Sequence, residues 1–160
     1  SFKWLIIPAQ NFIKKIKQEI NLFFDINNEI LKKDTCSTNL RKAELVAKSL
    51  FNNWLLANAV AKHNGDTFIA ILQPTLYHGM PNIKHLDKLN IQPDLYKEFN
   101  AVYPIIKKLM VQHKDLIVLD YTNIFDDLDI EVYIDSGHVN PKGTEKFAEK
   151  FIMSLEKLNL

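Results

Sequence analysis

The chain has 160 residues, of which 47% are hydrophobic and 24% charged, and its formal net charge is +1 at pH 7. This length and balance predict one domain, residues 1–160, with a buried core, and the near-zero net charge gives no reason to expect nucleic acid or an anionic membrane as a partner. The single cysteine, Cys36, excludes an internal disulfide framework but leaves a cytoplasmic, periplasmic or secreted location open, and without an apolar run of about eighteen residues we expect no transmembrane segment.

Residues 1–65 predict one strand and two helices. Residues 4–7 form a short apolar run that ends at a proline, as suits a buried strand. Apolar residues recur every three or four positions over residues 12–31 and again over residues 40–63, where Asn64-Gly65 supplies the stop. The polar segment 32–38 is predicted to be a loop. The second helix should bury one stripe, made of Ala43, Val46, Ala47, Leu50, Trp54, Ala57 and Ala61.

Two later stretches are continuously apolar and short, at residues 68–72 and 116–119. Such runs favour strands that are covered on both faces, as in a parallel sheet. Residues 75–92 between them should form a long loop beyond the first strand. Residues 93–110 predict a helix that Pro104 should kink or divide.

The order helix, strand, helix, strand, helix predicts an α/β fold, a three-layer α/β/α domain with a flavodoxin-like parallel sheet. The connection between the two strands is long enough for a right-handed crossover. In such sheets ligands bind beyond the carboxyl ends of the strands. We therefore expect the functional residues in the loops that follow the strands.

The stretch 132–143 carries the clearest chemical pattern. Asp135 and His138 stand three positions apart in a predicted turn, so the carboxylate can accept a hydrogen bond from Nδ1 and leave Nε2 free to take a proton from a nucleophile. Gly137 is expected to let the turn enter a conformation with positive φ. Asn140 suits a helix N-cap and Pro141 the first helical position. An ordinary surface turn followed by a cap would give the same pattern, whereas no second pair of ligands supports a metal site.

Asp-x-x-His followed by Asn-Pro-x-Gly and an amphipathic terminal helix resembles the closing block of the SGNH (GDSL-type) serine hydrolases. The resemblance implies that Asp135 is the catalytic acid and His138 the base of a Ser-His-Asp triad. It implies an ester as substrate, a carbohydrate O-acetyl or an acyl ester, and calls for no cofactor and no metal. It covers the later strands and helices of the family's domain.

The family's nucleophile lies in a Gly-Asp-Ser block, which this sequence lacks. The resemblance therefore implies that the chain begins near the family's third strand, with the serine upstream of Ser1, and that this stretch alone is inactive. Asn11 is the one residue that could match the family's asparagine that donates to the oxyanion, although a role as helix N-cap explains Asn11 better. An uncovered strand edge pairs readily, so we expect an N-terminal segment, a swapped dimer or a partner chain to cover it.

Two other functions remain open. The chain fits a non-catalytic binding or scaffold domain of the same fold that lacks the nucleophile. A flavodoxin-like nucleotide or response domain has less support, because no glycine-rich phosphate loop is present. Tyr77 and Tyr133 are candidates to stack on a substrate, while His78 and His85 would line the cleft or face solvent.

Overall fold

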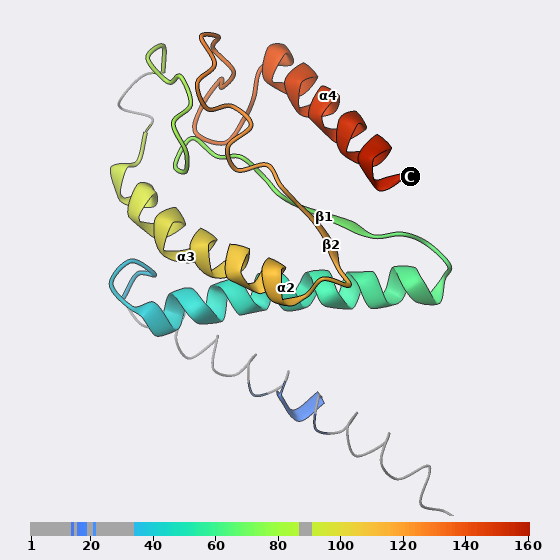
Figure 1. The fold of residues 1–160 in the computed structure, drawn as a ribbon. Helices are drawn as coiled ribbons and strands as arrows, with labels where there is room; N and C mark the ends of the chain where they lie inside the picture. Colours follow the sequence, from blue (N-terminus) through green and yellow to red (C-terminus); the bar gives the residue numbers. More distant parts are fainter. Residues whose placement is uncertain (1–13, 15, 19–20, 22–33, 87–90) are drawn as a thin grey trace, which may run out of the picture.

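The computed structural model describes residues 14, 16–18, 21, 34–86 and 91–160, and within them the fold is mixed α/β (Figure 1). The elements follow one another as α2 (Leu40–His63), β1 (Ile69–Leu72), α3 (Pro93–Gln112), β2 (Ile117–Asp120) and α4 (Pro141–Leu158). Their order and approximate bounds are those predicted. The strand expected at residues 4–7 and most of the helix expected at residues 12–31 lie outside the described residues.

In the described part of the chain β1 and β2 form a two-stranded parallel sheet, with Ile69 opposite Ile117 and Leu72 opposite Asp120. The backbone N–H of Tyr121 extends the pairing by donating to the carbonyl of Leu72 at 2.9 Å. Because the strands are parallel, their carboxyl ends lie side by side. The loops that follow each strand gather beyond these ends, while α2 and α3 lie together on one side of the strands (Figure 1).

The main core lies between the sheet and the pair α2 and α3. It is formed by side chains that are at most 7% exposed: Ala47, Phe51, Leu72, Tyr103, Ile106 and Leu116. The predicted stripe on α2 was wrong at Leu50, which is 38% exposed, whereas its neighbour Phe51 is 1% exposed. Buried Ala43, Ala47 and Phe51 recur every four residues, so the two small alanines share a face with the large ring.

The second face of the sheet is less covered than the sequence predicted. Along β1, Ala70 and Leu72 are buried on the α2 and α3 side, while Ile69 and Ile71 point to the other face and are half-buried. Tyr121, the residue after β2, contacts α4 in two ways. Its hydroxyl donates to the carbonyl of Lys150 at 3.1 Å, and its ring packs edge-on against Phe147. Helix α4 still leaves apolar side chains exposed: Ile152, Met153, Leu158 and Leu160.

Pro104 does not divide α3, which runs as one helix from Pro93 to Gln112. A proline removes the hydrogen bond to the carbonyl four residues earlier, that of Asn100. Both Pro104 and Asn100 are exposed, so water can satisfy that carbonyl. Of the two predicted outcomes, a kink or a division, the division was wrong.

The two neighbouring side chains on α2 give a direct test of this packing. Phe51→Ala should lower the free energy of unfolding by about 3–5 kcal/mol, because the cavity lies in the closed core. Leu50→Ala should cost only about 1 kcal/mol, since part of that side chain already meets water. Urea unfolding followed by circular dichroism measures both. Equal losses, or a larger loss for Leu50→Ala, would contradict the burial of Phe51 and the exposure of Leu50.

Candidate functional site

The Asp135 to His138 turn is the tip of a short hairpin formed by residues 132–140, here called the 132–140 hairpin. Tyr133 and Val139 face each other as an antiparallel bridge. The N–H of Ile134 donates to the carbonyl of His138 at 2.8 Å, and the N–H of Asn140 donates to the carbonyl of Val132 at 2.8 Å. The base of the hairpin is buried and its tip is exposed, which presents the tip on a fixed support.

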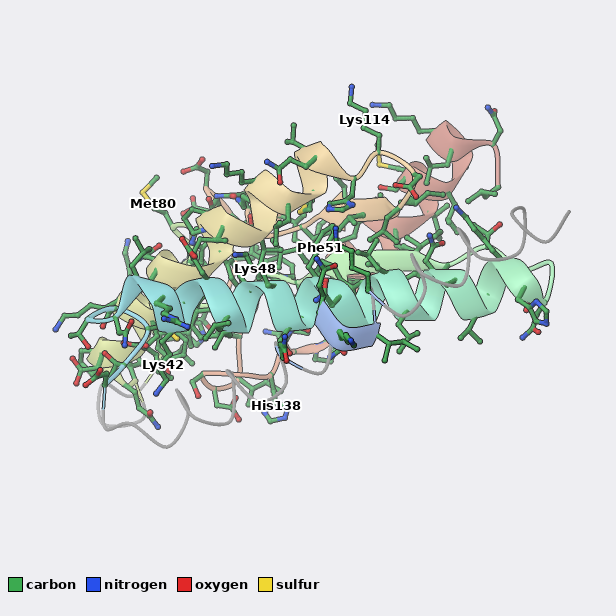
Figure 2. The ribbon with its side chains drawn as sticks, turned by 90° about the horizontal axis from the view of Figure 1, so that it is seen from below. Lys42, Lys48, Phe51, Met80, Lys114 and His138 are labelled. Atoms are coloured by element: carbon green, nitrogen blue, oxygen red, sulfur yellow. The ribbon has the colours of Figure 1, made fainter. Side chains whose placement is uncertain are left out.

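At the tip, Nδ1 of His138 lies 2.9 Å from both carboxylate oxygens of Asp135. An ionised carboxylate can only accept, so Nδ1 carries the proton and Nε2 of the neutral ring holds a lone pair. Across residues 34–86 and 91–160, no side chain is hydrogen-bonded to Nε2. The His138 side chain is 79% exposed and stands clear of the ribbon (Figure 2). The predicted hydrogen bond between the acid and the imidazole is present.

Backbone donors hold the carboxylate in place. The N–H of Gly137 donates to Oδ1 of Asp135 at 2.8 Å, and the N–H of His138 donates to the same oxygen at 2.9 Å. The bond from Gly137, followed by the bond from the His138 ring, lowers the pKa of Asp135 below that of an ordinary aspartate. The group is therefore ionised at neutral pH, as an acceptor for the imidazole must be.

Gly137 does not serve the purpose expected of it. Positive φ occurs at Gly65 and Gly79 but not at Gly137. An added Cβ at Gly137 would lie 3.9 Å from Oδ1 of Asp135, an ordinary contact. The Asp135 carboxylate accepts hydrogen bonds from the backbone N–H groups of Gly137 and His138, and these bonds close the turn without a residue in the left-handed conformation.

Within the Asn-Pro-x-Gly block the structure requires a glycine at Gly143, a residue to which the sequence pattern assigned no role beyond the motif. A Cβ there would lie 2.8 Å from the carbonyl oxygen of Val132 and 2.9 Å from Cβ of Val139. Asn140 caps α4 by accepting from the N–H of Gly143 at 3.0 Å, and its Nδ2 donates to the carbonyl of Glu131 at 2.6 Å. The Asn-Pro-x-Gly block thus packs the first turn of α4 against the hairpin.

The prediction that Tyr77 and Tyr133 stack on a substrate was wrong, because both side chains are buried. Tyr77 and Tyr133 are each 3% exposed and belong to a second core cluster beyond the strand ends, with Leu76, Phe125 and Val132. Burial raises the pKa of Tyr133, and its buried hydroxyl has no hydrogen-bond partner among the described residues. These rings support the hairpin from inside and offer no surface to a ligand.

The two loop histidines have partners within the protein. Nδ1 of His78 lies 3.0 Å from Oδ1 of Asn100 on α3. Nε2 of His85 lies 2.7 Å from the carbonyl oxygen of Tyr133, at the base of the hairpin. The structure therefore brings His85, but not His78, into contact with the segment that carries Asp135 and His138.

A charged cluster at the carboxyl end of β2 was not found from the sequence. Nζ of Lys107 lies 3.2 Å from Oδ2 of Asp120 and donates to Oγ1 of buried Thr122 at 2.7 Å, while Thr122 donates to Oδ1 of Asp120. Partial burial would raise the pKa of Asp120, but the hydrogen bonds from Thr122 and Lys107 outweigh it and lower that pKa. One feature of the sequence could have indicated this cluster, namely the position of Asp120 at the end of an apolar strand.

Two hollows in the described part of the chain are lined by neither Asp135 nor His138. One, of about 500 Å³, lies between the end of β2 and α4 and is lined by Asp120, Asn123, Ile124, Lys146, Glu149, Lys150 and Met153. The other, of about 480 Å³, lies between residues 80–84 and residues 127–129. The side chain of His138 is 79% exposed and that of Asp135 is 46% exposed, so the described residues leave the imidazole on open surface.

No serine is hydrogen-bonded to His138 in the part of the chain that the structure describes. Ser37 donates to Glu98, Ser154 donates to the carbonyl of Lys150, and Ser49 lies within α2. Ser136 lies in the turn itself. Asn11, the oxyanion candidate, lies outside the described residues. A search of the described residues also finds no group of three or more histidine, cysteine, aspartate or glutamate side chains arranged to hold a metal ion.

Comparison with known proteins gives no relative. No family model matches the chain, and neither a curated protein nor a solved structure matches it. None of the described helices combines the length and the apolar composition that a bilayer crossing requires.

The two glycines of this block predict opposite outcomes for the same substitution. Gly143→Ala should lower the free energy of unfolding by about 1–3 kcal/mol, because its methyl group would collide with the hairpin backbone. Gly137→Ala should stay within about 0.5 kcal/mol of the parent protein, since the space is free and the backbone is ordinary. Thermal unfolding of both variants measures the difference. A larger loss at Gly137 would contradict the geometry.

The titration of Asp135 gives a second test. The pKa of Asp135 is lowered in the folded protein, so the ionised carboxylate stabilises the fold. This stabilisation is fully present at pH values above the pKa of an ordinary aspartate, and it is lost as the pH falls through the lowered pKa of the folded state. The carbon resonance of its carboxyl group should therefore titrate below the ordinary range. In His138→Ala the Asp135 carboxyl group should still titrate below the ordinary range, because the hydrogen bond from the N–H of Gly137 lowers its pKa more than the bond from the His138 ring does. An ordinary midpoint in the parent protein would contradict the assignment.

Proposed function

We propose that this chain supplies the acid and the base of an SGNH (GDSL-type) serine hydrolase acting on an ester. The observation that carries the proposal is the 2.9 Å pairing of Nδ1 of His138 with the Asp135 carboxylate, on a hairpin beyond the carboxyl ends of two parallel strands. That pairing orients the ring and selects the tautomer in which Nε2 is the base. Ligands of open α/β sheets bind at this edge.

In the proposed reaction, Nε2 of His138 takes the proton of a serine hydroxyl as the serine oxygen attacks the ester carbonyl carbon. Asp135 stabilises the imidazolium that forms, and the imidazolium then protonates the alcohol oxygen as the ester bond breaks. Water, deprotonated by the same nitrogen, next attacks the acyl-serine, and its proton returns to the serine oxygen. Asp135 remains ionised throughout, in keeping with its lowered pKa.

The serine belongs to a segment that precedes Ser1 or to another chain. The high exposure of His138 supports this, since a base that works on a hydroxyl is normally covered by the element that carries that hydroxyl. The same segment would extend the sheet into the three-layer flavodoxin-like arrangement. Half-buried Ile69 and Ile71 support that extension, because an apolar sheet face gains stability when it is covered. The substrate class is a carbohydrate O-acetyl or an acyl ester.

A second candidate function is a binding or scaffold domain of the same fold that has no nucleophile. The observation in its favour is that Nε2 of His138 meets no hydroxyl among the described residues. In this case the Asp135 and His138 pair closes a turn and nothing more. Reactivity toward a serine-directed probe separates the two functions.

The test uses the protein made from its complete coding sequence and a fluorophosphonate probe, which forms a bond to activated serines. The parent protein should be labelled, and His138→Ala should slow labelling by at least roughly a thousandfold, because the general base is gone. Asp135→Asn should also slow it, since the ring loses its fixed tautomer. His63→Ala, an exposed histidine in the last turn of α2, is the matched control and should label as the parent does.

Labelling that persists in His138→Ala would remove His138 from the mechanism. A parent protein that resists the probe, while remaining folded by circular dichroism, would favour the binding domain.

A further inference from the structure

The backbone of Tyr133 has its carbonyl directed away from the hairpin. The two hydrogen bonds that flank the bridge join Ile134 to His138 and Val132 to Asn140, so Tyr133 and Val139 form a pair that does not exchange hydrogen bonds. In such a pair the N–H and C=O groups of both residues point outward, away from the partner segment. The carbonyl of Tyr133 therefore needs a donor from elsewhere in the fold.

His85 supplies that donor from the loop that follows β1. Its Nε2 lies 2.7 Å from the carbonyl oxygen, and its side chain is only 20% exposed. In the described part of the chain this is the one hydrogen bond between residues 73–86 and the 132–140 hairpin. A carbonyl can only accept, so Nε2 of His85 carries a proton.

The remaining nitrogen of His85 faces a carboxylate. Nδ1 lies 3.9 Å from Oε1 of Glu131, the residue that precedes the buried base of the hairpin. In the neutral ring Nε2–H donates to Tyr133, and a protonated ring keeps that bond while its positive charge faces Glu131. The link to the hairpin therefore persists in either protonation state.

We propose that His85 is a positioning residue for the Asp135 and His138 pair, an inference that rests on the proposed function. Tyr133 is two residues from Asp135 along the same hairpin strand, so a shift of its carbonyl moves the carboxylate that orients the imidazole. Core packing holds the side chains of Val132 and Tyr133, and His85 fixes the outer edge of the backbone between them and the tip. The loop after β1 thereby sets the direction of Nε2 of His138.

The experiment compares two substitutions at one position in the protein made from its complete coding sequence. His85→Phe keeps a ring of similar shape and removes the donor. His85→Gln keeps a donor, because its side-chain amide nitrogen can reach the place of Nε2. Should His85→Phe fail to fold, His85→Asn takes its place, since it is polar but too short to reach Tyr133.

Two readouts are measured on each variant. One is the rate of labelling by the fluorophosphonate probe. The other is the tautomer of His138, read from the ¹⁵N resonances of labelled histidine and assigned with His138→Ala. The tautomer reports the orientation of the pair directly and does not require any activity.

We expect His85→Phe to slow labelling by roughly ten- to hundredfold and to convert His138 from the Nδ1–H form to a mixture of tautomers, because small misplacements of reacting groups are costly. His85→Gln should label within about threefold of the parent, since the donor is retained. Parent-like labelling and an unchanged tautomer in His85→Phe would overturn the proposal and leave the hydrolase standing. A parent protein that is not labelled would overturn the hydrolase, and the tautomer would then decide the role of His85.

Discussion

Burial of Val132 and Tyr133 fixes the base of the 132–140 hairpin, and the exposed Asp135 and His138 pair depends on that base. A carboxylate and an imidazole on a mobile surface turn would gain little from each other, because water competes for both. Here the backbone hydrogen bonds of Gly137 and His138 also converge on the carboxylate. The result is an ionised acceptor held against Nδ1, which selects the tautomer whose lone pair lies on Nε2.

The rest of the described fold supports this hairpin from three sides. Helix α4 contacts it closely through Gly143, where no side chain would fit. The second core cluster places Leu76 and Phe125 against its inner side. Beyond the strand ends, the loop after β1 contributes His85 to its outer edge. The parallel pairing of the strands brings all three supports to one end of the molecule.

Much of this fold could be read from the sequence, because apolar periodicity reports which residues must be covered. Helix α2 has its predicted bounds, and both strands lie where the apolar runs are. The sequence could not show which of Leu50 and Phe51 is buried in the core. Two adjacent apolar residues both suit a buried stripe, and the rotation of the helix against its neighbours decides which of them is covered. The continuity of α3 through Pro104 depended on exposure, which the sequence does not show.

For the site, the sequence predicted the hydrogen bond between Asp135 and His138, because both partners lie in one short turn. It could not place Tyr77 and Tyr133, whose burial results from packing between two loops distant along the chain. It also missed the bond from His85 to the carbonyl of Tyr133, since a backbone acceptor leaves no trace in the residue pattern. The hydrogen bond within the turn was predictable, whereas the backbone conformation of Gly137 and the contacts between segments required the structure.

The most direct measurement is a crystal structure of the protein, made from its complete coding sequence, after reaction with a fluorophosphonate. We predict phosphorus bonded to a serine Oγ, with Nε2 of His138 within about 3.2 Å of that oxygen and Nδ1 still paired with Asp135. An adduct on a residue remote from His138, or an imidazole turned away from Asp135 in the adduct, would contradict it.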